Sequence, residues 1–213
     1  RPSYPFGHGL AYTTFEFSDL RAEVTEITPD TGLDEVVLTA SFTVVNTGSR
    51  RGVAVPQLYL GYLESSVDRP PRELRGFQHL ELEPGESVHA EIRVTRRDLS
   101  FWDVRTHSWC VETGWIRVEI GASAEDIKLR LETTLLTPPR LLPLTEWSTV
   151  TEWRQHPGAW EKLEPFLAAF EEETEFFLLD LPVCKLPLMF EDTLTFDQLT
   201  ELLAEIRTTP SVP

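Results

Sequence analysis

Apolar and polar residues alternate with a period of two in four stretches of this chain. The stretches are VVLTASFTVVN (36–46), SVHAEIRVT (87–95), WIRVEIG (115–121) and IKLRLE (127–132). Successive side chains of a strand point to opposite faces, so each stretch predicts a strand with one buried face and one face in water. In WIRVEIG the alternation assigns Glu119 to the solvent face.

Turn-forming sequences separate these stretches, among them PDTG, NTGSRRG, EPGES and GASAED. No helical period lies between them. About seven or eight short strands joined by such turns predict a mainly β fold, an antiparallel β-sandwich that begins near residue 15.

The pattern changes at TPPRLLPL (137–144), whose three prolines suit an extended connector. After it the period is helical. We expect a short helix within 148–155 and another that starts at Pro157 and is kinked or restarted at Pro165. A last helix is expected over 196–206, with Thr195 as N-cap and Gln198 completing a capping box.

This tail is rich in large apolar side chains, and the run FFLLDLPVCKLPLMF (176–190) would be poorly soluble if exposed. About 65 residues interrupted by prolines predict a poor independent core. We therefore expect the last helix to pack a stripe on apolar surface of the same polypeptide, formed by Phe196, Leu199, Leu203 and Ile206.

Catalytic and metal-binding patterns are missing from the sequence. The five histidines form no HExxH cluster, GHGLAY lacks the third glycine of a phosphate loop, and there is no GxSxG. We expect no catalytic residue, no cofactor and no metal site. Cys110 and Cys184 lie among apolar residues, which favours buried, inert thiols, although a disulfide between them stays open.

The formal net charge is −16, and the acidity is densest after residue 137. Such a chain would be repelled by nucleic acid and by anionic lipid. No apolar run is long enough to span a bilayer. We expect a soluble protein with no nucleic-acid or membrane partner. The compartment stays open, with the cytoplasm slightly favoured.

The first residues, RPSYPFGHGLAYTTFEFSDL, form a stiff aromatic arm before any strand pattern. YPFGHGLAYTTFEFS resembles the sequence that precedes the fibronectin type III-like domain of family 3 glycoside hydrolases, the β-glucosidase and β-xylosidase class. Four later motifs agree in order: VVNTGSRRGVAVPQLYLG, RPPRELRGFQHLELEPGES, RRDLSFWDV and WIRVEIGASAEDIKLR. His8 and Ala11 depart mildly from the family pattern. The tail is similar, more weakly, to a helical extension of some bacterial members.

The resemblance implies an immunoglobulin/fibronectin III-like sandwich over 15–136, an interdomain arm over 1–14 that leaves a missing upstream α/β domain, and a helical extension over 137–213. Members of the family are retaining glycosidases with two carboxylates about 5–5.5 Å apart. Both carboxylates precede the matched region, so none carries over. The chain is then a non-catalytic accessory region of a β-glucosidase-like enzyme. Its partners are the upstream catalytic domains and, as a second candidate, a β-glucoside-type carbohydrate. The expected interdomain packing residues are Tyr4, Phe6, His8, Tyr12, Arg72 and Trp102.

Two other functions stay open: a free-standing carbohydrate-binding module, which needs an exposed, coplanar aromatic platform, and a protein-interaction domain. Within RRDLSFWDV we expect Phe101 or Trp102 to be buried as a plug at the end of the sandwich.

Overall fold

The structure is a computed structural model that describes residues 3–138, 142–168, 178–189 and 194–208. It divides into two compact units, which are described separately. The first comprises Arg1–Asp103 and Ser108–Pro139, and the second comprises Val104–His107 and Arg140–Pro213.

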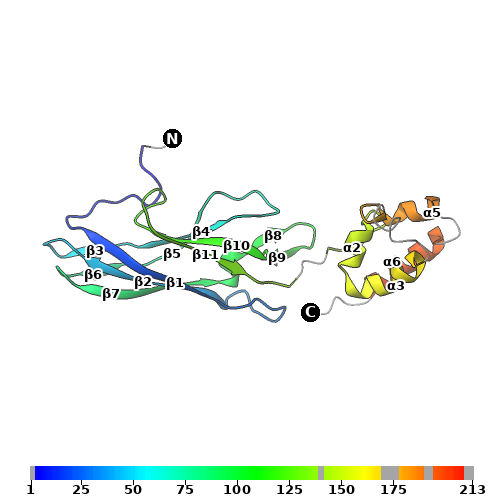
Figure 1. Ribbon diagram of the computed structural model, residues 1–213, viewed down its shortest axis with the longest axis horizontal. Helices are drawn as coiled ribbons and strands as arrows, with labels where there is room; N and C mark the ends of the chain where they lie inside the picture. Colours follow the sequence, from blue (N-terminus) through cyan, green and yellow to red (C-terminus); the bar gives the residue numbers. More distant parts are fainter. Residues whose placement is uncertain (1–2, 139–141, 169–177, 190–193, 209–213) are drawn as a thin grey trace. The chain divides into compact units, whose positions relative to one another are not determined.

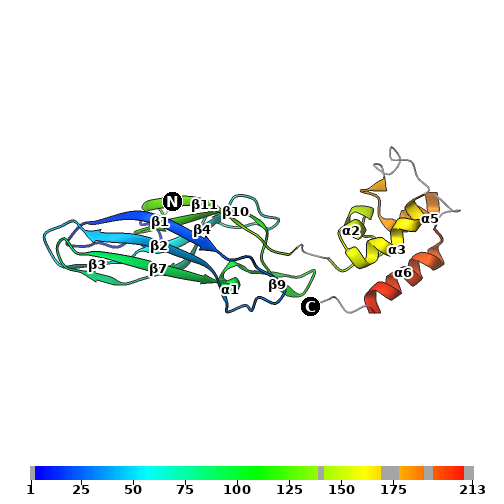
Figure 2. The same cartoon turned by 60° about the horizontal axis from the view of Figure 1, so that its bottom comes forward.

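The first unit is built from antiparallel strands in two main layers (Figures 1 and 2). One sheet has the order β1-β2-β7, and the other has the order β11-β10-β4-β5. Two small sheets pair β3 with β6 and β8 with β9. The strands are β1 (Phe15–Val24), β2 (Val36–Asn46), β3 (Gly52–Ala54), β4 (Gln57–Tyr62), β5 (Glu73–Phe77), β6 (Leu80–Leu82), β7 (Ser87–Thr95), β8 (Phe101–Asp103), β9 (Ser108–Cys110), β10 (Gly114–Gly121) and β11 (Ile127–Leu135), with a short helix α1 (Arg96–Leu99) after β7. The predicted antiparallel β-sandwich is confirmed.

The core of the sandwich consists of the apolar members of the alternating stretches. Each such side chain contributes roughly 1.5–3 kcal/mol when it leaves water. Fully or almost fully buried examples are Phe42 and Val44 of β2, Leu58 and Leu60 of β4, Val94 of β7, and Ile116, Val118 and Ile120 of β10.

Asn46, at the end of β2, is completely buried and uses its whole side chain in hydrogen bonds. Its Nδ2 donates to the carbonyl oxygens of Arg50 (2.8 Å) and Leu82 (3.0 Å). Its Oδ1 accepts from the Thr13 hydroxyl (2.7 Å) and the Gly48 amide (3.1 Å). One polar side chain therefore ties the end of the arm to two loops of the sandwich.

The second unit is helical. Its described elements are α2 (Val150–Arg154), α3 (Pro157–Leu167), the 3-10 turn η1 (Val183–Lys185), α5 (Leu186–Met189) and α6 (Phe196–Thr208). Thr149 and Glu152 form a capping box before α2. The predicted box of Thr195 and Gln198 is confirmed, since each donates its backbone N–H to the other's side chain. Pro157 is the first residue of α3 as predicted. The helix continues through Pro165, so it is not restarted there, and a kink at that residue stays a prediction.

The tail has a hydrophobic core of its own, so the expectation of a poor independent core is wrong. Trp153 and Leu163 are fully buried in it. Leu178, Val183 and Leu186 join them from the apolar run at 176–190, whose first two and last residues lie outside the described residues. The stripe of α6 packs here through Leu199 and Leu203, with Ile206 at its margin. Phe196, by contrast, is 52% exposed, which corrects its place in the predicted stripe.

Candidate functional site

The most buried charge in the sandwich is Glu119, on the outer face of β10. Its neighbours in sequence, Val118 and Ile120, point into the core. Glu119 itself is only 1% exposed, so its predicted place in solvent is wrong. The alternation gave the correct face of the strand, but other parts of the chain cover that face.

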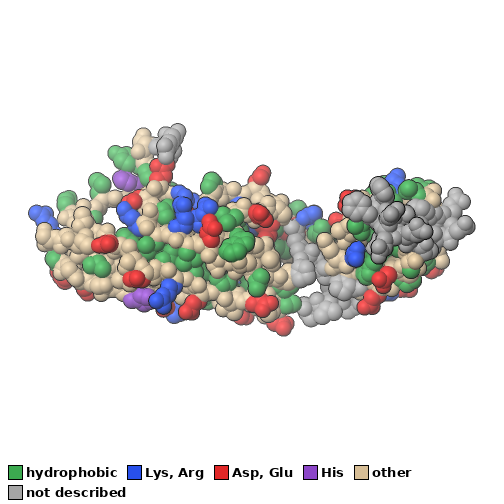
Figure 3. Space-filling model, in the orientation of Figure 1, with side chains coloured by type: hydrophobic (Ala, Val, Ile, Leu, Met, Phe, Trp, Pro, Cys, Tyr) green, Lys and Arg blue, Asp and Glu red, His purple; other side chains and the backbone are tan. Residues whose placement is uncertain are grey.

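Two guanidinium groups neutralise Glu119, one on each carboxylate oxygen. Arg72 Nε lies 2.9 Å from Oε2. Arg130, the neighbour of Glu119 across the β10–β11 ladder, places Nε 2.8 Å and Nη2 2.7 Å from Oε1. Arg72 Nη1 also donates to the carbonyl of Ala124. Figure 3 shows Lys and Arg side chains gathered over this part of the sheet.

Arg72 reaches the sheet because the loop between β4 and β5 folds back over it. At Gly61, on the outer face of β4, a β-carbon would lie 2.7 Å from the carbonyl oxygen of Pro71. Any larger residue would therefore push this loop away from the sheet. The glycine in QLYLGY and the prolines in DRPPRE act together to place Arg72.

Arg72, Glu119 and Arg130 form a polar layer on the outer face of the sheet. Gln57 and Tyr59 extend this polar layer along β4 towards the N-terminal arm. The Tyr59 hydroxyl donates to Gln57 Oε1 at 2.5 Å. Burial raises the pKa of Tyr59, and nearby Arg72 offsets part of that rise. Gln57 Nε2 donates to the carbonyl oxygens of Gly7 and Ala122, both at 3.0 Å.

The arm is thus fastened by its backbone. Besides the Gly7 carbonyl, the Phe6 carbonyl accepts from the Ala124 amide at 2.9 Å. Gly7 has a φ of 75°, and a β-carbon there would lie 2.0 Å from Gln57 Oε1. Only glycine fits this position without displacing Gln57.

The side chains of the arm, in contrast, point away from the sandwich. Tyr4, Phe6 and Tyr12 are 70%, 66% and 92% exposed, and Leu10 is 94% exposed. The rings of Tyr4 and His8 stack with their centroids 5.1 Å apart. The arm therefore presents a row of aromatic groups on a backbone that is fixed in place.

A second polar cluster on the sandwich surrounds Arg69. Its guanidinium lies 3.9 Å above the ring of Tyr62 and 3.3 Å from Glu73 Oε2, on which Arg75 also converges at 2.9 Å. Burial raises the pKa of Tyr62, while Arg69 and Arg75 partly oppose the rise. Its hydroxyl donates to the Leu99 carbonyl.

Glu112 completes this cluster. It accepts from the Ser65 hydroxyl (2.6 Å) and the Ser66 amide (2.8 Å). Burial alone would raise the pKa of Glu112, but these hydrogen bonds and Arg69 outweigh it, so the net shift is downwards. Glu112 is therefore an ionised anchor for the loop at 65–69 and a poor proton donor near neutral pH.

Trp102 is 49% exposed, so it is not the buried plug expected from RRDLSFWDV. It packs edge-on against Trp109 across the β8–β9 pair, with ring centroids 5.6 Å apart and planes at 75°. Phe101 is half-buried near Arg69, and the fully buried residue of the motif is Leu99. Both tryptophans stay partly exposed at this hairpin, since Trp109 is 40% exposed.

The predicted packing residues therefore fall in three places: Tyr4, Phe6, His8 and Tyr12 on the arm, Arg72 in the polar layer, and Trp102 on the hairpin. Arg72 meets the arm indirectly, since both bind Ala124. Sequence reasoning missed Gln57, Glu119 and Arg130. Each stands on a strand as an ordinary polar residue, and only the pairing of β4, β10 and β11 brings them together.

Neither Cys110 nor Cys184 forms a disulfide, and both are half-buried, so full burial is not found either. Among the described residues, no three His, Cys, Asp or Glu side chains are grouped as a metal ion would require. None of the helices in the described part of the chain combines the length and apolar character needed to cross a bilayer.

Comparison with known proteins places the sandwich in a family. Residues 54–124 match the family model of the fibronectin type III-like domain. This sandwich is a fibronectin type III-like domain. The match includes β4, β10 and Glu119, and so most of the polar layer.

Proteins similar to this chain are β-glucosidases. The chain is 40% identical over 147 residues to probable beta-glucosidase D of Aspergillus niger, which is 64% of this chain and 19% of that protein. Solved structures of β-glucosidases are also similar to this chain. The GH3 beta-glucosidase of Bifidobacterium adolescentis has a TM-score of 0.63 and 33% identity over 74% of this chain and 22% of its own. Beta-D-glucoside glucohydrolase of Trichoderma reesei has a TM-score of 0.60 and 37% identity over 63% and 20%. The chain spans about a fifth of the length of the relatives it matches.

Proposed function

We propose that this chain is a non-catalytic accessory region of a β-glucosidase-like retaining glycoside hydrolase and packs on the catalytic domains that precede it. The observation that carries the proposal is the similarity to β-glucosidases over only a fifth of their length. In this proposal the arm is the interdomain connection, and residues 137–213 are a helical extension.

The chemistry of the polar residues supports this role. A retaining glycosidase needs one carboxylate as nucleophile and a second carboxyl group that donates a proton. Glu119 and Glu73 are instead held by arginines, and the lowered pKa of Glu112 keeps it ionised. These carboxylates anchor loops to the sheet and thereby give the outer surface a fixed shape.

The arm supplies the docking surface in this proposal. Its backbone is fixed by Gln57 and Ala124, whereas Phe6 and Tyr12 are exposed in the chain by itself. Large aromatic side chains on a rigid backbone lose little conformational entropy on binding, so they make effective anchors. Arg72 and Trp102 are the further proposed contacts.

The first experiment reads the genomic DNA on the 5′ side of the codon for Arg1. The proposal expects an open reading frame there that encodes a glycoside hydrolase catalytic region. A stop codon directly upstream would overturn it. The purified 213-residue chain should also fail to hydrolyse an aryl β-glucoside, and turnover that is lost on replacing one of its own carboxylates would contradict the assignment.

Variants of the arm test the docking surface. Phe6→Ala and Tyr12→Ala should lower the melting temperature of the whole enzyme but leave that of the 213-residue chain unchanged, because both side chains are exposed in it. Phe77→Ala is the matched control, since Phe77 is 57% exposed on β5, outside the arm. Equal effects of the three variants on the enzyme would refute the docking role.

Titration with cello-oligosaccharides, followed by tryptophan fluorescence, tests the alternative of a carbohydrate-binding module. The planes of Trp102 and Trp109 lie at 75°, so this pair does not form the coplanar platform on which a sugar chain stacks. We expect no saturable change. Saturation at micromolar to low-millimolar sugar would favour the module.

A further inference from the structure

Strand β7 is the last strand of the sheet β1-β2-β7, so one of its edges faces away from β2. The Asn46 amide donates to the Glu86 carbonyl at 3.0 Å, and backbone groups alternate in direction along a strand. The even-numbered residues that follow, such as Ala90 and Ile92, therefore bond to β2. The backbone groups of His89, Glu91 and Arg93 point to the open edge.

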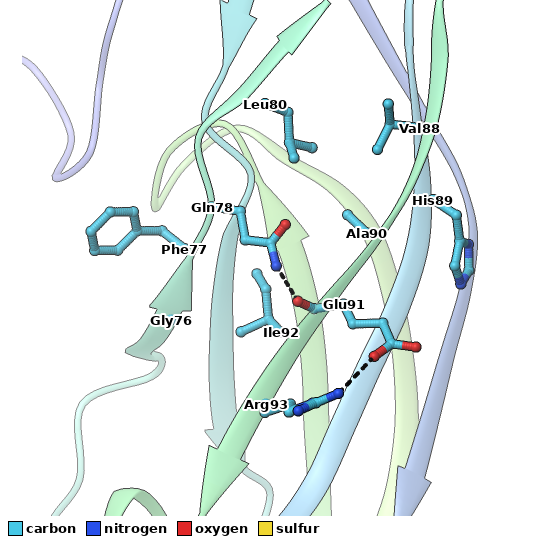
Figure 4. Close-up of a pocket in the computed structure, with 10 residues that line it drawn as sticks. All are labelled: Gly76, Phe77, Gln78, Leu80, Val88, His89, Ala90, Glu91, Ile92 and Arg93. Atoms are coloured by element: carbon cyan, nitrogen blue, oxygen red, sulfur yellow. Dashed lines mark hydrogen bonds and ion pairs between the residues drawn. The ribbon is translucent and has the colours of Figure 1, made fainter.

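A side chain from a neighbouring loop confirms this direction. Gln78 Nε2 donates to the carbonyl of Glu91 from the side opposite β2, as Figure 4 shows. The amide of Gln78 thus occupies the place that the N–H of an added strand would take. Beside it lies a groove of about 670 Å³ between β5 and β7, with Leu80, Val88 and Ile92 among its lining residues.

A strand edge with unpaired backbone groups can bind an added strand. The charged side chains on β7 indicate which partner sequence would pair best with it. Glu91 and Arg93 project from the solvent face of β7, and their side chains are 47% and 68% exposed. Within the strand, Arg93 Nη2 lies 3.6 Å from Glu91 Oε2. Because Glu91 and Arg93 are two residues apart on the same face, an antiparallel second copy of β7 can place its Arg93 opposite Glu91 and its Glu91 opposite Arg93.

We propose that two copies of this chain pair antiparallel through their β7 edges, with the twofold axis at Ile92. In this register Glu91 of each copy lies directly opposite Arg93 of the other. These two residues would exchange both backbone hydrogen bonds, since both point to the edge away from β2, once the Gln78 side chain has released the Glu91 carbonyl. Two opposite-charge pairs therefore form at once, and cross-strand pairs of this kind stabilise antiparallel sheets.

Neighbouring registers fit less well. A shift that centres the axis on Glu91 places the two Glu91 carboxylates opposite one another. A shift to Ala90 places Glu91 opposite His89 and leaves Arg93 opposite Ser87. Only the register at Ile92 uses both charges of the strand. The net charge of −16 on each copy opposes association, so we expect a weak, reversible dimer.

Sedimentation velocity of the 213-residue chain, from about 1 to about 500 µM at physiological salt, tests the proposal. The expected result is a monomer that converts to a dimer as concentration rises. Glu91→Arg and Arg93→Glu should each raise the dissociation constant about tenfold or more, because each turns two attractive pairs into repulsive ones. The double variant Glu91→Arg/Arg93→Glu should restore dimerisation. Arg51→Glu, at another exposed arginine, is the control.

Amide hydrogen exchange supplies a second measurement. The amides of Glu91 and Arg93 should gain protection with concentration, whereas those of Ala90 and Ile92 are protected throughout by β2. A chain that stays monomeric at every concentration overturns the proposal, and so does a dimer that neither single variant weakens. A dimer weakened by Glu91→Arg but not by Arg93→Glu overturns the register at Ile92. Unchanged melting curves of the variants exclude misfolding as the cause. The outcome is independent of the proposed function, because it concerns the chain alone.

Discussion

Replacing Glu119 by Gln should destabilise the β-sandwich strongly, although the two side chains have nearly the same shape. The carboxylate accepts one charge-assisted hydrogen bond from Arg72 and one from Arg130, lies 2.7 Å from Arg130 Nη2, and is 1% exposed. A Gln side chain retains one acceptor oxygen and turns its NH₂ group towards a guanidinium, so one arginine loses its partner. Breaking a buried pair in this way costs about 3–5 kcal/mol.

Part of that cost is recovered because the Arg130 side chain is 52% exposed and can turn towards water. We therefore expect about 2–4 kcal/mol for Glu119→Gln. For a domain of this size, this lowers the melting temperature by roughly 10 °C. Scanning calorimetry measures the shift, and exchange of the β10 amides assigns it to the sandwich, because the helical unit has a separate core.

Glu132→Gln is the matched control. Glu132 lies on β11, 3.5 Å from Arg117, and its side chain is 47% exposed. Exposed pairs contribute about 0.2–1 kcal/mol, so the control should melt within a few degrees of the parent. If the two variants melt at the same temperature, the reasoning that burial makes the Glu119 pairs strong is wrong.

Three further predictions concern other parts of the chain. Asn46→Ala should lower the free energy of unfolding in urea by about 3–4 kcal/mol, since four hydrogen-bonding groups lose their partner; a loss under about 1 kcal/mol would contradict this. Glu112→Gln should destabilise the sandwich most above pH 4.5, the ordinary pKa of a glutamate side chain, and less in acid. The reason is that a carboxylate with a lowered pKa in the folded state contributes stability that is lost as the pH falls through that pKa. A difference in stability from the parent that stays constant from acid to neutral pH would refute this prediction. Leu199→Glu with Leu203→Glu should unfold the helical unit and shift the fluorescence of buried Trp153 to longer wavelength, while exchange of the β10 amides stays unchanged; retained blue emission would show that α6 is not needed for that core.

The proposed dimer and the polar layer use opposite kinds of strand position. Glu91 and Arg93 lie on the exposed face of an edge strand, where exposed pairs are weak and matter for choosing a register. Glu119 lies on a central strand under covering loops, where losing a partner is expensive. The same kind of ion pair therefore specifies association at one site and stability at the other.

Local sequence patterns predict strands β2, β7, β10 and β11, the start of the last helix and the mainly β fold. Alternation in VVLTASFTVVN and WIRVEIG reports which face of a strand is apolar, and Thr195 with Gln198 marks a helix start, because both signals act between residues close in the chain. The family resemblance was likewise carried by local motifs in order, and the match of residues 54–124 confirmed it.

Contacts between distant segments determine which outward-facing residues are buried. Arg117 and Glu119 lie on the same face of β10. The loop that bears Arg72 nevertheless brings a cation to Glu119, whose carboxylate is buried. Likewise Trp102 stays half exposed while Leu99 fills the interior, and the tail closes its own core around Trp153. These outcomes depend on segments far apart in the chain meeting in space. A pattern of neighbouring residues gives the direction of a side chain, but it carries no information on what distant part of the chain will cover it.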